Sequence, residues 1–136
     1  MTSTQTKAVI DDYYASLRNG DGVRLRDLLA ENVEWRMPIS LPNNLHVGRE
    51  MVTAELIGDT VKRTFAKGSF HMLVRQIVVE GDVAVVRQHV DAVSKIGRDY
   101  HMDYCFIYTV REGRITLIEE YLDTRLAAEI LELEHS

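Results

Sequence analysis

The sequence has little cysteine and little proline: its 136 residues include one cysteine, Cys105, and two prolines, Pro38 and Pro42. One cysteine cannot form a disulfide within the chain, which fits a reducing compartment. The chain also lacks the roughly 18 consecutive apolar residues of a membrane span, and it does not begin with an apolar run of the signal-peptide type. We therefore expect a cytoplasmic protein with no membrane segment.

An excess of basic residues is also absent. The formal net charge is −5, whereas a nucleic-acid-binding surface needs clustered positive charge, so nucleic acid is not an expected partner. Apolar residues make up 46% of the chain, which is ordinary for a globular protein. The length is typical of one domain, and we expect a single domain over residues 1–136.

The first half of the sequence is mainly helical in pattern. Apolar residues recur at helical spacing over residues 5–18, with Ser3 or Thr4 as the expected N-cap. A second helix follows Asn19-Gly20-Asp21, and a third is predicted over residues 49–65. Between them lie a short strand, residues 33–37, and an irregular segment that holds both prolines.

From residue 70 the period changes from helical to alternating. Four strands are predicted, over residues 70–80, 83–94, 100–110 and 114–122, with turn signals between them. Asp123 or Thr124 then caps a C-terminal helix. Helices followed by hairpin-linked strands indicate an α+β fold, in which a cone-shaped, strongly curved antiparallel sheet wraps around the N-terminal helices and encloses a pocket.

Three segments carry a resemblance to a known superfamily: AVIDDYYASLRNGD near the start, VEWRMP with the following HVGREMV, and YTVREGRITLIEEYLDT near the end. With the order of elements, they resemble the nuclear transport factor 2-like superfamily, which includes SnoaL-like polyketide cyclases, ketosteroid isomerases, scytalone dehydratases and limonene-1,2-epoxide hydrolases. The resemblance covers nearly the whole chain. It does not select one reaction, because this fold hosts many.

The limonene epoxide hydrolase type offers the nearest catalytic analogy. In that family an Arg-x-Asp motif lies on a middle strand and a second acid lies on the last strand. Here Asp91 matches the first acid and Glu120 the second, while His89 stands in place of the arginine. The family's water-holding tyrosine and asparagine fall on Glu34 and Arg36. Both acids of the family's site are therefore present here, whereas its arginine, tyrosine and asparagine are replaced.

The ketosteroid isomerase type offers a second analogy. Tyr13 matches the position of a hydroxyl donor in that family, but its general-base aspartate falls on Met37 or Arg36, and neither is an acid. A buried core tyrosine is the plainer interpretation of Tyr13.

Alternation sorts the strand residues into faces. On the strand over 100–110, the face with Met102 and Tyr104 is the larger and more apolar one, so it is expected to line the pocket. On the strand over 83–94, Arg87, His89 and Asp91 share one face and small residues form the other. Periodicity does not decide which of these two faces points toward the pocket. The superfamily resemblance favours the face of His89 and Asp91. The alternative is that this face is solvated or lies in a dimer interface.

These observations predict a cofactor-free acid–base enzyme for a small, apolar, terpenoid-, steroid- or polyketide-like substrate. The catalytic residues would be Asp91, Glu120 and His89. Epoxide hydrolysis or epoxide-opening cyclisation fits this set; an isomerase or dehydratase, or a ligand-binding dimer without chemistry, are the alternatives. The resemblance implies a homodimer through the outer sheet face. The histidines lack metal-ligand spacing, so no metal site is expected.

Three of the expected substrate-binding side chains come from the first half of the chain and three from the second. They are Tyr13, Glu34, Arg36, Arg87, Met102 and Tyr104.

Overall fold

A computed structural model describes residues 1–135 of the chain as one curved sheet with five helices. The helices are α1 (Ser3–Asn19), α2 (Gly22–Asp27), α3 (Arg49–Leu56), α4 (Asp59–Thr64) and α5 (Thr124–His135). The strands are β1 (Leu29–Arg36), β2 (Leu45–Val47), β3 (His71–Glu80), β4 (Val83–Val93), β5 (Asp99–Arg111) and β6 (Arg114–Tyr121). Within the described residues, no helix combines the length and apolarity needed to cross a membrane.

Helix α1 begins and ends at residues that satisfy its backbone. Thr2 is the N-cap, one residue before the predicted position, and it forms a capping box with Gln5. Gly20 caps the C-terminal end of the helix, and its φ of 64° lies in the left-handed region that glycine adopts without strain. One face of α1, with Ile10 and Tyr13 among its residues, is buried against the sheet.

The sheet is mixed rather than purely antiparallel. Its strand order is β2-β1-β6-β5-β4-β3. Strands β3 to β6 pair antiparallel, as predicted, but β1 pairs with β6 in parallel. The prediction of an antiparallel sheet is therefore wrong at this one pairing. The hairpin signals link only the four strands of the second half, and α3 and α4 separate β1 from those strands.

Three boundaries also differ from the predictions. The segment predicted to be irregular contains β2, which pairs antiparallel with β1. The single helix predicted over 49–65 is two helices, because Gly58 has a φ of 110° between them. Strand β1 begins at Leu29, four residues before the predicted start of this strand at residue 33.

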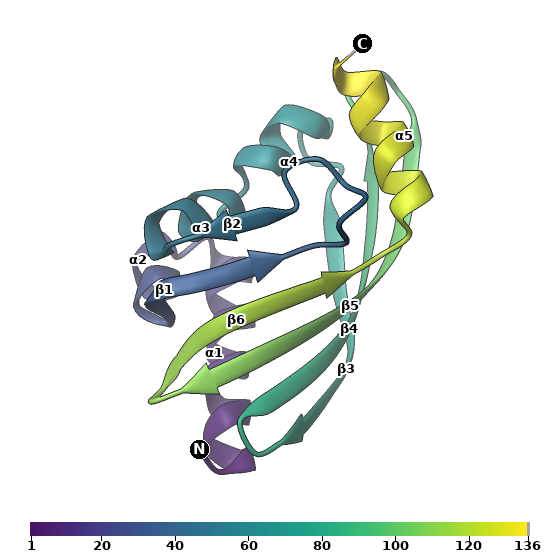
Figure 1. The fold of residues 1–136 in the computed structure, drawn as a ribbon. Coiled ribbons are helices and arrows are strands. Elements are labelled where there is room, and N and C mark those ends of the chain that lie inside the picture. Colours follow the sequence, from purple (N-terminus) through teal and green to yellow (C-terminus); the bar gives the residue numbers. More distant parts are fainter. Residues whose placement is uncertain (136) are drawn as a thin grey trace.

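The helices cover the concave face of the sheet (Figure 1). Helix α1 packs against β3 and β4, and α3 packs against β1. Helix α5 lies at the other end, against α4 and β5, so the two termini lie at opposite ends of the fold. The buried residues form two clusters, one beneath α1 and one beside α5. The predicted α+β fold with a strongly curved sheet is confirmed, and the sheet is not closed.

Candidate functional site

An apolar cavity of about 300 Å³ opens between the two buried clusters. That volume is at the lower end of the range for small-molecule sites. Its wall comes from β1, the inner faces of β3 to β6, and helices α1, α3, α4 and α5. Most of the lining is aromatic or aliphatic, including Trp35, Met37, Phe65, Phe70, Met72 and Phe106.

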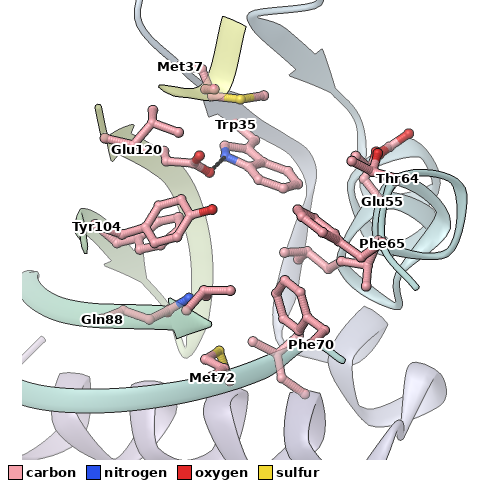
Figure 2. Close-up of a pocket in the computed structure, with 18 of the residues that line it drawn as sticks. Trp35, Met37, Glu55, Thr64, Phe65, Phe70, Met72, Gln88, Tyr104 and Glu120 are labelled. Carbon is pink, nitrogen blue, oxygen red and sulfur yellow. Dashed lines mark hydrogen bonds between the residues drawn. The ribbon is translucent and has the colours of Figure 1, made fainter. Parts of the chain in front are cut away.

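Glu120 is a carboxylic acid within this apolar wall. The residue is 6% exposed, and its carboxylate accepts a hydrogen bond from the indole N–H of Trp35, with 3.0 Å between Nε1 and Oε1. Figure 2 shows the two side chains meeting at the cavity edge. They come from neighbouring strands, since β1 runs parallel to β6 with Trp35 opposite Ile118. Trp35 therefore reaches the carboxylate across one inter-strand gap.

The direction of Glu120 depends on an irregularity in β6. Residues Thr109 and Val110 on β5 pair with Leu117 and Ile115, so Thr116 is an extra residue on β6. A residue of this kind changes which side chains point inward. Both Ile115 and Ile118 are consequently buried, and Glu120 continues on the inner face while Glu119 points away.

Burial raises the pKa of Glu120 from 4.5 to about 7, and the hydrogen bond from Trp35 opposes this rise. Burial acts by removing water from the charged form, whereas a donor to the carboxylate stabilises that form. A carboxyl group that titrates near neutral pH can both accept and donate a proton, which is the requirement for general acid–base catalysis.

Two tyrosine hydroxyl pairs lie near the cavity, which Tyr100, Tyr104 and Tyr108 line. The hydroxyls of Tyr100 and Tyr104 are 2.7 Å apart, and those of Tyr14 and Tyr108 are 2.6 Å apart. Burial raises the pKa of Tyr104 well above 10, so its hydroxyl is a neutral donor. In Figure 2 the Tyr104 hydroxyl and the Glu120 carboxylate face the same part of the cavity.

The second pair is held by a further contact. The hydroxyl of Tyr14 donates to Oε1 of Gln88 at 3.1 Å, and Gln88 lies on the inner face of β4. This contact holds the Gln88 amide at the cavity wall, next to the buried cluster beneath α1.

The predicted inward face of β4 is wrong. The cavity and core side of β4 carries Ala84, Val86, Gln88, Val90 and Ala92, all of them buried. Alternation then directs Arg87, His89 and Asp91 to the outer face of the sheet. The physical reason is that small side chains on β4 allow α1 to pack closely on the concave face. Asp91 and Glu120 thus lie on opposite sides of the sheet and form no acid pair.

Three further predicted binding residues also lie outside the cavity lining. Glu34 and Arg36 form an ion pair on the other face of β1, with Nη2 and Oε2 3.2 Å apart. Met102 is fully buried in the core beside α5 and does not reach the cavity surface. Tyr13 and Tyr104 do line the cavity, at the positions expected for them.

Trp35 and Glu55 are among the wall residues that sequence reasoning missed. Trp35 shares a face with Val33 and Met37, and the same alternation that places Glu34 outside would have placed Trp35 inside. Glu55 lines the opposite side of the cavity, where it accepts a hydrogen bond from Thr60. No motif marks Glu55, because its position depends on the break between α3 and α4.

The outer face of the sheet holds a second polar cluster, formed by His89, Asp91, His101 and Asp103. The imidazole of His89 lies between two carboxylates, with Nδ1 2.8 Å from Asp103 and Nε2 2.7 Å from Asp91. Hydrogen bonds with Asp103 and then Asp91 raise the pKa of His89. Asp91 also contacts Nδ1 of His101 at 2.6 Å, and its hydrogen bonds with His101 and then His89 lower its pKa.

Comparison with known proteins adds a family and several structural neighbours. The SnoaL-like domain family matches residues 10–118, and no curated protein matches the sequence significantly. An NTF2-like protein from Burkholderia xenovorans LB400 superposes with a TM-score of 0.79 at 24% identity, covering 96% of this chain and 98% of that one. TerC, co-crystallised with polyporic acid, superposes with a TM-score of 0.78 at 23% identity, covering 94% of this chain and 98% of that one. An LEH-like epoxide hydrolase of M. tuberculosis superposes with a TM-score of 0.70 at 16% identity, covering 97% of this chain and 92% of that one.

Proposed function

The chain belongs to the SnoaL-like domain family, and we propose that it is a cofactor-free proton-transfer enzyme for a small, mainly apolar molecule. The observation that carries this proposal is Glu120, a carboxyl group whose pKa lies near 7 inside an apolar cavity. The alternative of a cavity that only binds a ligand gives no reason for a desolvated acid, which costs stability.

Glu120 acts as the base and then as the acid. Its carboxylate removes a proton from a carbon next to a carbonyl group, and the resulting carboxylic acid returns that proton to another carbon or to oxygen. Such general acid–base catalysis contributes about 10²–10⁴ in rate. The indole N–H of Trp35 orients the carboxylate during both steps.

Tyr104 stabilises the negative charge that develops on the carbonyl oxygen. When the Tyr100 hydroxyl donates the hydrogen bond to Tyr104, the Tyr104 hydroxyl is free to donate its own hydrogen bond to a bound oxygen. Since the pKa of Tyr104 is raised by burial, this hydroxyl keeps its proton and acts as a hydrogen-bond donor.

This chemistry favours isomerisation, dehydration or cyclisation by proton transfer over epoxide hydrolysis. A two-acid epoxide hydrolysis would use Asp91 with Glu120, and Asp91 lies on the outer sheet face. One carboxyl group is enough for a shuttle that removes and returns a proton. The likeness to an epoxide hydrolase of M. tuberculosis supports the fold and leaves the reaction open, since one fold hosts many.

We further propose a homodimer formed through the outer sheet face, in a reducing cytoplasm that suits the free thiol of Cys105. Val78, Val85 and Ile107 face each other across three strands and form an apolar row on that face. Val78 is 53% exposed in the single chain, so a second copy would bury it.

The proton-transfer function is tested with 5-nitrobenzisoxazole, a small apolar probe that responds to any well-placed base. Glu120 would take the proton from C3, the C–H electrons would form the nitrile, and the N–O bond would break to release a coloured phenolate. We expect turnover by the wild type and a loss of about 10²–10⁴-fold in Glu120→Gln.

The control is Glu119→Gln, which changes the neighbouring glutamate on the other face of β6 and should keep full turnover. Binding of the probe with no turnover above that of free acetate would contradict proton transfer and support a ligand-binding module instead.

A further inference from the structure

The outer-face cluster on β4 and β5 brings together four side chains through strand pairing. His89 is opposite Asp103 and Asp91 is opposite His101, so two rows each carry one histidine and one aspartate. Residues two apart on a strand share a face, and directly opposed residues are near neighbours. The arrangement depends on the register between two strands, not on a local sequence motif.

Three of these side chains offer ligand atoms that are close to one another. Nitrogens of His89 and His101 and an oxygen of Asp91 all lie within 4.8 Å of each other. We propose that His89, Asp91 and His101 bind a divalent transition-metal ion of the zinc type on the outer face of the sheet. Two imidazoles and one carboxylate suit such an ion, whereas calcium and magnesium prefer oxygen ligands throughout.

Asp103 completes the arrangement as a positioning residue. It lies 2.8 Å from Nδ1 of His89, the ring nitrogen opposite to the one that faces Asp91. A metal-bound histidine usually donates its other N–H to a carboxylate, which fixes the ring and strengthens the metal bond. His89 can therefore present Nε2 to the ion while Nδ1–H donates to Asp103.

The cluster has room to open around an ion. The Asp91 oxygen is now 2.7 Å from His89 and 2.6 Å from His101, which are hydrogen-bond lengths. Ligands that each sit about 2.0–2.1 Å from one zinc ion lie roughly 3.3 Å apart. In the single chain the side chains of Asp91 and His101 are 54% and 65% exposed, so a shift of under about 1 Å meets little packing.

Three protein ligands leave at least one coordination position of the ion open. Structural zinc sites are closed by four protein ligands, whereas a site with three keeps a position for water or another molecule. This position faces away from the cavity of Glu120, because the cluster lies on the opposite side of the sheet. The metal site is thus separate from the proposed proton-transfer site, and neither proposal depends on the other.

The test is titration of tag-free, chelator-treated full-length protein with zinc chloride in a calorimeter, with cobalt(II) absorption as a second readout. We expect one saturable ion for each chain and visible cobalt bands that zinc abolishes. His101→Ala and Asp91→Ala should lose binding, while Asp103→Asn should weaken it by about 10–100-fold.

His46→Ala is the matched control, since His46 lies at the cavity and not in the cluster. It should bind zinc as the wild type does. Circular dichroism checks that each variant is folded. The proposal is overturned if the wild type shows no saturable binding, or if folded His101→Ala and Asp91→Ala bind zinc with unchanged affinity.

Discussion

Trp35 donates its indole N–H to Glu120 across the one parallel strand pairing of the described sheet, at 3.0 Å. This contact joins an aromatic residue from the first half of the chain to an acid from the last strand. It places a carboxyl group with a pKa of about 7 against an apolar cavity.

Stability should depend on pH through Glu120. Its carboxyl group loses its proton near pH 4.5 in the unfolded chain and near pH 7 in the folded protein. Between these values the folded protein binds more protons than the unfolded chain, so the free energy of unfolding falls as pH rises and then levels off above about 7. The difference is on the order of 3 kcal/mol.

Glu120→Gln removes this ionisation and keeps an oxygen that can accept from Trp35. Urea unfolding should therefore find the variant more stable than the wild type at pH 8, by up to about 3 kcal/mol, and similar to it near pH 4.5. Glu119→Gln should retain the pH dependence of the wild type. Equal stability losses in Glu120→Gln at both pH values would contradict a desolvated carboxylate.

Catalysis should require the ionised form of Glu120. The rate of proton removal from 5-nitrobenzisoxazole is expected to rise with pH through about 7 and then to reach a plateau. Trp35→Phe removes the donor that stabilises the carboxylate, so the midpoint of the pH–rate profile should move to higher pH. A profile with the wild-type midpoint in Trp35→Phe would show that the indole has no electrostatic role.

Tyr104→Phe should slow turnover of a carbonyl substrate by about 10²-fold, because the loss of one oxyanion donor has that order of effect. Substrate affinity should change less, since the ring and its packing remain. The measurement is kcat and KM for the substrate, with Tyr121→Phe on the exposed outer face as control. A kcat that is equal in Tyr104→Phe and the wild type would exclude Tyr104 as the donor.

The proposed dimer predicts that one surface variant has half the molar mass of the wild type in solution. Val78→Glu places a charge in the apolar row on the outer face, so light scattering at micromolar concentration should show a monomer, with thermal stability of the chain retained. Val23→Glu is the control, because Val23 is 81% exposed on α2 and is not part of the apolar row on the outer sheet face. A wild type that is already monomeric would contradict the dimer.

The α+β fold could be predicted from the sequence because its signals are local. Helical spacing over residues 5–18 and alternation from residue 70 onward each lie in continuous segments, and the glycine turns between them are explicit. The break at Gly58 was not predicted, since an apolar stripe passes through it and only the backbone shows the left-handed residue.

The site was harder to predict because it depends on which face of each strand packs against the helices and on the register between neighbouring strands. Both faces of β4 carry apolar residues, and the choice between them follows from the close packing of α1 on Ala84 and Val86. Glu120 was found, but its inward direction depends on the extra residue at Thr116. His101 joins His89 and Asp91 only through the pairing of β4 with β5, which no spacing rule contains.

The central claim is that Glu120 titrates near neutral pH inside the cavity, and carbon-13 NMR of glutamate-labelled protein measures this most directly. The account predicts one glutamate carboxyl resonance that titrates with a pKa of about 7 and is missing from the spectrum of Glu120→Gln. If the resonance that Glu120→Gln removes titrates near 4.5 instead, the carboxyl group is not desolvated and the account is wrong.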